Sequence, residues 1–306
     1  MGVAVPSFDY GVRQRLTTRF GAQVAAWFDQ LPTVLRSLAA DWQLELGAPI
    51  NRGSVCVVIR CRLSDGRRAV LKVSPDRERL ATEAEALGEW TTEHTPAVLA
   101  IDTRAGALLL EAIEPGDPLS VSMSYPDLGT VAELLTCLHT SGRPDPRYPA
   151  VAQRVRYLFD SSAKLYQLYP ELTEVVSPAL YERGRQLAAR LAAQPSPAVL
   201  LHGDLTPSNI LDGGTECGLV AIDPAPCLGD AAFDAVDLIL WQADDVGTIE
   251  ARAERLAAAT GADAERLLGW CTAFAGMVAL ELASQGHSQS PRIEALLDLA
   301  ARARTR

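Results

Sequence analysis

The sequence predicts a two-lobed α+β protein, with an antiparallel sheet and a helix in the first lobe and a mostly helical second lobe. Short apolar runs rich in β-branched residues, separated by turn formers, dominate residues 42–113. From residue 127 onward, apolar residues recur mainly at helical spacing. The chain of 306 residues is long enough to bury two cores, and Pro and Gly cluster at 114–118. We therefore predict domains at 1–115 and 116–306.

The composition is that of a globular protein, with 48% hydrophobic and 22% charged residues. A net charge of −10 argues against nucleic-acid binding, which requires a basic surface. The charge would suit a cationic substrate, but many cytoplasmic proteins are acidic, and this ordinary acidity is the favoured explanation. The six cysteines form no C-x-x-C pair, so we expect neither a zinc site nor a disulfide framework. We expect no signal sequence and no membrane span, which places the protein in the cytoplasm.

The first lobe is predicted to begin with helices over residues 8–40, separated at Pro32. A loop at 47–54 joins the first two strands, and the turn at 64–67 joins the second and third. The predicted strands are 42–46, 55–63, 69–74, 97–103 and 107–113. The second lobe is predicted to contain helices at 127–139, 150–169, 177–193, 231–243, 248–259, 263–284 and 291–304.

Lys72 lies in the middle of an apolar strand, AVLKV. Burying a lysine there without an anionic partner costs several kcal/mol. An edge strand that turns Lys72 toward water is the alternative. The next predicted helix carries Glu83 and Glu85, of which only one can face Lys72.

Residues 199–223 bring together Asp204, Asn209 and Asp223. Magnesium prefers a few hard oxygen ligands from protein, with substrate phosphates completing its shell. Asn209 and Asp223 meet that requirement, and Asp204 is left to face an acceptor hydroxyl. These residue types also form turns and caps, so a hairpin without function is the alternative.

The pattern H-G-D-x-x-x-x-N at 202–209, followed by Ile222-Asp223, resembles the catalytic and metal loops of the protein-kinase-like fold. It resembles the aminoglycoside phosphotransferase family in particular. The further runs Ile222-Asp223-Pro224, Leu228-Gly229-Asp230 and Phe233-Asp234 are similar to the streptomycin, viomycin and hydroxyurea phosphotransferases. The resemblance implies a bilobal fold, with 1–115 as the nucleotide-binding lobe and its helical extension and 116–306 as the catalytic and substrate-binding lobe.

The resemblance also implies roles for individual residues. Asp204 would be catalytic, Asn209 and Asp223 would bind Mg²⁺, and His202 would be structural. Lys72 would bind the α- and β-phosphates of ATP, with GTP as the alternative nucleotide. Glu83, four residues before a leucine as in the family, is the favoured partner of Lys72, with Glu85 as the alternative.

Two further segments would contact the nucleotide. The loop at 47–54, which includes Ser54, would lie over the phosphates, although it lacks the G-x-G-x-x-G pattern. The stretch Glu111-Ala112-Ile113 would be the hinge whose backbone meets the adenine edge.

The resemblance implies an ATP- and Mg²⁺-dependent O-phosphotransferase for a small hydroxylated molecule, with a streptomycin-type aminoglycoside first and antibiotic resistance as the outcome. A viomycin-like peptide, hydroxyurea, an amino sugar and choline are alternative acceptors, and a catalytically silent binding module is an alternative function. Pro224 should make the metal loop rigid, which favours a small-molecule kinase over a regulated protein kinase. Six acids are candidate amine ligands that also have structural interpretations: Asp230, Asp234, Asp237, Asp244, Asp245 and Glu281. The acceptor and the oligomeric state stay open.

Overall fold

The computed structural model describes residues 5–51 and 55–303, which divide into two compact units. The first unit runs to Glu89 and includes Thr95–Gly116, and the second comprises Trp90–His94 and the chain from Asp117. The short segment Trp90–His94 joins the second unit through hydrogen bonds: the Trp90 indole N–H donates to the Leu138 carbonyl at 3.1 Å. The sequence analysis places this segment in the first domain.

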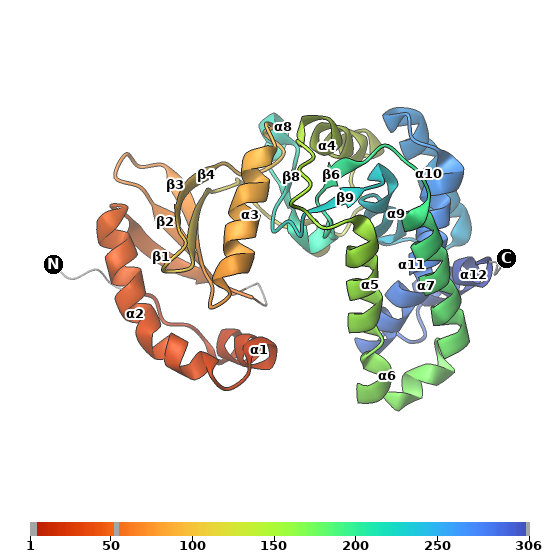
Figure 1. The fold of residues 1–306 in the computed structure, drawn as a ribbon, viewed down its shortest axis with the longest axis horizontal. Coiled ribbons are helices and arrows are strands. Elements are labelled where there is room, and N and C mark those ends of the chain that lie inside the picture. The colour runs from red at the N-terminus through yellow and green to blue at the C-terminus, as the bar shows by residue number, and fades with distance from the viewer. Residues whose placement is uncertain (1–4, 52–54, 304–306) are drawn as a thin grey trace. The chain divides into compact units, whose positions relative to one another are not determined.

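The first unit is built on a five-stranded antiparallel sheet with the strand order β1-β2-β3-β5-β4. The strands are β1 (Glu45–Ile50), β2 (Val57–Arg62), β3 (Arg68–Val73), β4 (Val98–Asp102) and β5 (Ala107–Glu111). In Figure 1, α1 (Tyr10–Phe20) and α2 (Val24–Asp41) lie on one side of this sheet and α3 (Arg77–Glu89) lies on the other.

Alternate residues of the central strands supply the two cores on either side of the sheet. Leu71 and Val73 of β3 pack in the core formed with α1 and α2. Leu108 and Leu110 of β5 pack with Leu80 of α3 in a separate core. Lys72, between Leu71 and Val73, therefore points to the face that α3 covers.

The break between the first two helices lies at Gly21, not at Pro32 as the sequence analysis predicts. Gly21 adopts a φ of 79°, and its N–H donates to the Thr17 carbonyl at 2.8 Å. Pro32 lies inside α2, where it removes one backbone hydrogen bond. The helix continues because Phe28 and Leu35, on either side of Pro32, are buried against the sheet.

The first strand also begins later than predicted. Trp42 ends α2, and β1 takes up Gly47–Ile50, which the sequence analysis assigns to a loop. Pro49 is tolerated because the β1–β2 pairing shifts register between Leu46 and Pro49, at a bulge. Ser54 lies outside the described residues.

The second unit is mostly helical and surrounds α11 (Ala264–Ser284), a helix buried along most of its length. The helix predicted at 150–169 breaks after Ser162, and the helix predicted at 231–243 becomes a 3-10 turn followed by α9. The other helices are α4 (Leu128–Ser141), α5 (Val151–Ser162), α6 (Leu165–Leu168), α7 (Pro178–Ala193), α8 (Gly214–Cys217), α9 (Val236–Leu240), α10 (Val246–Thr260) and α12 (Pro291–Ala301). The 3-10 turns of the structure are Leu119–Val121, Pro170–Glu174, Pro207–Asn209 and Ala231–Phe233.

Helix α11 has the length and apolarity of a membrane span, with a mean hydropathy of 1.5, which the sequence analysis does not anticipate. Its apolar window is 72% buried inside the protein. Residues such as Trp270 and Phe274 pack on Phe233 and Phe159. These contacts are those of a core helix, which passes the same test of length and composition.

Two short antiparallel pairs in the second unit carry the loops of interest. Strand β6 (Val199–Leu201) pairs with β9 (Cys227–Gly229), and β7 (Ile210–Asp212) pairs with β8 (Leu219–Ala221). The His-Gly-Asp segment follows β6 directly, and Asn209 and Asp223 flank the β7–β8 pair.

Candidate active site

Lys72 and Glu83 form a buried ion pair in the first unit. The Lys72 ammonium donates to a Glu83 carboxylate oxygen, and both residues are buried, at 3% and 5% exposure. The pair forms because the β3 side chain at position 72 points toward α3. Glu85, the alternative partner, is exposed on the same helix. The expected pairing of Lys72 with Glu83 is therefore confirmed.

The segment predicted to be the nucleotide hinge consists of the end of β5 and the turn that follows it. Glu111 closes β5, and its N–H donates to the Ala97 carbonyl at 2.9 Å. Ile113 is half-buried, and its carbonyl would clash with any Cβ at Gly116, at 2.3 Å. Gly116, with a φ of 75°, is required by this turn.

The loop after β6 turns sharply at Gly203, which has a φ of 76°. A Cβ at this position would lie 2.1 Å from the Ala225 carbonyl oxygen. Only glycine fits, because both the left-handed conformation and the close backbone contact exclude a side chain. This turn sets the direction in which Asp204 leaves the strand.

Asp234 anchors the His-Gly-Asp loop through hydrogen bonds to its backbone. Its two carboxylate oxygens accept the backbone N–H groups of His202, at 2.8 Å, and of Gly203, at 2.9 Å. His139 Nε2 lies 3.1 Å from the same carboxylate. Burial opposes ionisation of Asp234, but the hydrogen bonds that it accepts from His139 and from the Gly203 N–H favour its charged form, and its pKa is lowered.

His202 is a structural residue, as the family resemblance implies. Burial lowers the pKa of its imidazole, so the ring is neutral at pH 7. Its Nε2 lies 3.0 Å from the Ile222 carbonyl and therefore carries the proton. Its Nδ1 accepts the Asp204 N–H at 3.4 Å. The ring thus joins the His-Gly-Asp segment to the segment that carries Asp223.

Both carboxylate oxygens of Asp204 are engaged by neighbours in the second unit. Oδ1 accepts from Arg154 Nη2 at 2.7 Å, and Oδ2 accepts from Asn209 Nδ2 at 3.1 Å. Asn209 Nδ2 also donates to the Asp204 carbonyl at 2.9 Å. The Asp204 side chain keeps 31% exposure, so one side of the carboxylate is open to an incoming group.

Asn209 and Asp223 lie at adjacent ends of the β7–β8 pair, where the Ile222 N–H donates to the Asn209 carbonyl at 2.8 Å. Asp223 adopts a φ of 60°, a left-handed conformation that Asp tolerates better than most residues. Since the Asn209 amide nitrogen is used on Asp204, its amide oxygen is left as a ligand. A carboxylate and an amide oxygen are hard ligands that fit Mg²⁺. Among the described residues, no three His, Cys, Asp or Glu side chains form a metal cage, so phosphates and water would supply the other ligands.

Three of the six candidate amine ligands serve the fold. Asp230 accepts from the side chains of Arg266 and Trp270, both at 2.5 Å. Asp245 caps α10 by accepting the Thr248 N–H at 2.7 Å. Asp234 holds the loop as described above.

Asp237 and Glu281 are different, because each is charge-coupled to Asp204. Burial first, and then the charges of Asp204 and Glu281, raise the pKa of Asp237 to about 7. Burial first, and also the charge of Asp204, raise the pKa of Glu281. Arg154 and Arg292 partly offset the negative charge around Asp237. Acids on α9 and α11 therefore lie within electrostatic range of the Asp204 carboxylate.

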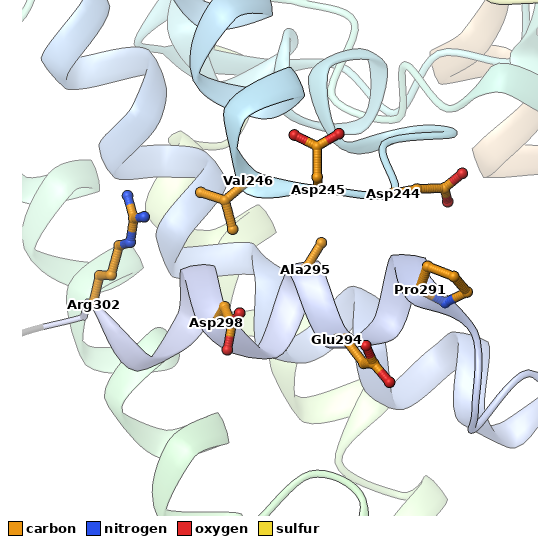
Figure 2. A pocket seen from close by; sticks show the side chains of 8 residues that line it. All are labelled: Asp244, Asp245, Val246, Pro291, Glu294, Ala295, Asp298 and Arg302. Carbon is orange, nitrogen blue, oxygen red and sulfur yellow. The ribbon is translucent and has the colours of Figure 1, made fainter.

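A surface hollow of about 540 Å³ between the start of α10 and α12 carries the sixth candidate, Asp244 (Figure 2). Its lining residues are Asp244, Asp245, Val246, Pro291, Glu294, Ala295, Asp298 and Arg302. Asp245 is occupied by its cap, and Arg302 pairs with Glu250 at 2.5 Å. None of the predicted catalytic or metal residues lines this hollow, so we do not assign the acceptor site to it.

The sequence analysis missed Arg154, and helical spacing contains no signal that sets it apart. Val151, Val155 and Phe159 form the buried stripe of α5, and Arg154 and Arg156 flank this stripe on its two sides. Only the structure shows that Arg156 is exposed and that Arg154 reaches Asp204, fifty residues later in the chain.

Solved structures identify the class of fold. The choline kinase LicA from Streptococcus pneumoniae matches with a TM-score of 0.58 at 16% identity, over 89% of this chain and 99% of that one. Aminoglycoside phosphotransferase APH(4)-Ia matches with a TM-score of 0.57 at 14% identity, over 88% and 99%. These similarities show the bilobal protein-kinase-like fold that the sequence analysis predicts.

Sequence comparison identifies the family within that class. Residues 41–286 match the model of the aminoglycoside/hydroxyurea antibiotic resistance kinases, and the chain belongs to this family. The chain is 30% identical to streptomycin 6-kinase of Streptomyces glaucescens, over 82% of each chain. It is 29% identical to hydroxyurea phosphotransferase of Kitasatospora aureofaciens, over 82% of this chain and 72% of the relative. It is therefore an enzyme, a phosphotransferase with an alcohol group as acceptor.

Proposed function

We propose that this enzyme transfers the γ-phosphate of ATP to a hydroxyl of a streptomycin-type aminoglycoside in the cytoplasm, and thereby confers resistance. The observation that carries this proposal is the surroundings of Asp204. Its carboxylate is held at both oxygens, and the acids Asp237 and Glu281 are charge-coupled to it. Such a site can orient a hydroxyl and stabilise a cationic group beside it.

The reaction asks the protein mainly for positioning and charge neutralisation. Asp204 accepts a hydrogen bond from the acceptor hydroxyl and directs its oxygen toward the γ-phosphorus. That oxygen forms a bond to phosphorus while the bond from phosphorus to the β–γ bridging oxygen breaks, and ADP leaves with the electron pair. The hydroxyl proton passes to the Asp204 carboxylate and then to water.

The remaining predicted residues have supporting roles in this proposal. Lys72, held by Glu83, binds the α- and β-phosphates as a point charge. Asn209 and Asp223 hold Mg²⁺, which supplies charge neutralisation at the phosphates when bound. The loop containing Ser54 and the backbone of Glu111 and Ile113 contact the nucleotide.

Hydroxyurea is the second candidate acceptor, because the chain is also similar to a hydroxyurea phosphotransferase. Hydroxyurea carries no positive charge at pH 7, so it would gain nothing from two acids near Asp204. Streptomycin-type acceptors carry guanidinium groups that would neutralise those acids. Burial first, and then the charges of Asp204 and Glu281, raise the pKa of Asp237 to about 7, and the repulsion among these three acids favours the cationic acceptor.

An ADP-release assay with ATP and Mg²⁺ tests the proposal on streptomycin, viomycin, hydroxyurea, an amino sugar and choline. We expect turnover on streptomycin to exceed turnover on hydroxyurea. Asp204→Ala should reduce kcat at least about 10²-fold while nucleotide binding is retained, because the residue acts on the acceptor.

Three results would count against parts of the proposal. Turnover on none of the acceptors, with ATP still bound, would favour a silent binding module. Unchanged turnover in Asp204→Ala would remove the assigned role of Asp204. Phosphorylation of hydroxyurea alone would leave the reaction intact and replace the acceptor.

A further inference from the structure

Arg154 is a partly buried cation beside Asp204, outside the loop that carries the predicted catalytic residue. It projects from α5 and keeps 13% side-chain exposure, less than the 31% of Asp204. Its Nη2 donates to Asp204 Oδ1 at 2.7 Å, and its Nε donates to the Gly203 carbonyl at 2.7 Å. Its guanidinium also lies 5.5 Å from the centre of the Tyr157 ring.

The loop that presents Asp204 cannot supply this charge itself. Residues 199–212 contain neither Lys nor Arg. The cation that pairs with Asp204 therefore comes from a separate element, whose register is fixed by the buried residues Val151, Val155 and Phe159. A guanidinium anchored in this way is a more rigid partner than a surface side chain.

Arg154 and Asn209 hold opposite oxygens of the Asp204 carboxylate. Two of the lone-pair positions of the carboxylate are thus occupied, and others are left for an acceptor hydroxyl. Because Asp204 is more exposed than Arg154, the arginine supports the carboxylate from the protein side and does not cover it. The same charge lowers the cost of keeping Asp237 near Asp204.

We infer that Arg154 is a positioning residue for phosphoryl transfer, which keeps Asp204 in the rotamer that faces the acceptor hydroxyl. This inference rests on the proposed function. Arg154 acts through Asp204 and touches neither the nucleotide nor the acceptor in this assignment. Its loss should therefore lower kcat much more than it raises KM for either substrate.

A purely structural role is the competing interpretation, since Arg154 also bonds to the Gly203 carbonyl. The two interpretations differ in what a small guanidinium ion can restore. An ion that enters the space left by Arg154→Ala can again pair with Asp204, whereas it cannot repair a misfolded loop.

The experiment compares Arg154→Ala and Arg154→Lys with Arg156→Ala, a matched control on the exposed side of the same helix. We expect kcat to fall about 10²-fold in Arg154→Ala, less in Arg154→Lys and not in Arg156→Ala, with KM values within about 3-fold. Guanidinium chloride at tens of millimolar should restore about 10-fold in Arg154→Ala alone. If Arg154→Ala does not fold, Arg154→Lys and Arg154→Gln take its place in the kcat and KM comparison.

A double variant checks that the effect passes through Asp204. Adding Arg154→Ala to Asp204→Asn should reduce kcat by less than about 3-fold further, because the group to be positioned has already been altered. Independent, multiplicative losses would overturn the inference, as would a kcat near wild type in Arg154→Ala. Equal losses in Arg154→Ala and Arg156→Ala would overturn it too. A wild-type enzyme without turnover on any acceptor would defeat the proposed function itself, and the inference would fall with it.

Discussion

Asp234 and Asp237 lie three residues apart in the second unit, and their pKa values shift in opposite directions although burial opposes ionisation of both. Asp234 accepts two backbone N–H groups and contacts His139, and its pKa is lowered. Burial first, and then the charges of Asp204 and Glu281, raise the pKa of Asp237 to about 7. The surroundings of Asp234 thus stabilise its ionised form, whereas those of Asp237 destabilise it.

The difference separates an acid that holds the catalytic loop from an acid whose charge is only partly compensated. Donors already surround Asp234, so a cationic ligand would have little to add there. The charge of Asp237 is only partly offset by Arg154 and Arg292. A cation placed beside Asp237 would relieve repulsion that the protein itself leaves in place. Three predictions test this contrast.

The largest effect is expected from Asp234→Ala. The variant leaves the N–H groups of His202 and Gly203 without an acceptor in a buried position, where each unmet hydrogen bond is costly. We expect the free energy of unfolding to fall by about 3–5 kcal/mol in urea denaturation at pH 7. The kcat should fall with it, because the loop no longer fixes Asp204. Asp298→Ala, at an exposed position on α12, is the control and should change little.

Glu83 is a second buried acid, and a single cation, Lys72, is its partner. It tests whether one ion pair stabilises a buried carboxylate as well as the hydrogen bonds of Asp234 do. Glu83→Gln deprives the buried Lys72 of its carboxylate, and we expect a loss of about 2–3 kcal/mol of unfolding free energy. Nucleotide affinity should weaken as well, by about 10-fold in a titration. The exposed Glu85→Gln on the same helix should stay within about 0.5 kcal/mol. Equal effects of the two substitutions would contradict the assignment of Glu83 as the partner.

The sequence predicted the position of a residue correctly where that position depends on local contacts or on a clear repeating pattern. The alternation of β3 placed Lys72 between core residues, and the His-Gly-Asp motif identified the loop that presents Asp204. The sequence analysis did not predict the break at Gly21 or the bulge at Pro49. Packing of α2 and pairing with β2 outweigh the local preference of proline at these places.

The contrast between Asp234 and Asp237 could not have been predicted from the sequence. Both follow the same motif, within one turn and a short helix, and both are flanked by apolar residues. Their difference comes from partners on distant elements: His139 of α4 for Asp234, and Glu281 of α11 for Asp237. Only the packing of these helices assigns the partners.

The smallest effect, and the most direct test of the contrast, is the pH dependence of Asp237→Asn. A carboxyl whose pKa is higher in the folded than in the unfolded protein binds its proton more tightly when folded. The stability due to this proton is complete below the unfolded pKa of about 4 and is lost as pH rises through about 7. Asparagine does not titrate, so the variant should gain stability relative to wild type as pH rises.

We expect Asp237→Asn to equal wild type or fall slightly below it at pH 5, and to exceed it by about 1 kcal/mol at pH 8 in urea denaturation. The charged groups around position 237 are Asp204, Glu281, Arg154 and Arg292. Glu281, whose pKa is also raised, adds a slope of the same sign to both proteins. Because Glu281 and Asp237 repel each other, the substitution also changes the slope due to Glu281, so the difference reports on this pair of acids. Asp298→Asn provides the control. If the unfolding free energies of Asp237→Asn and wild type change in parallel with pH, Asp237 is stabilised in its ionised form as Asp234 is. The argument for a cationic acceptor would then lose its main support.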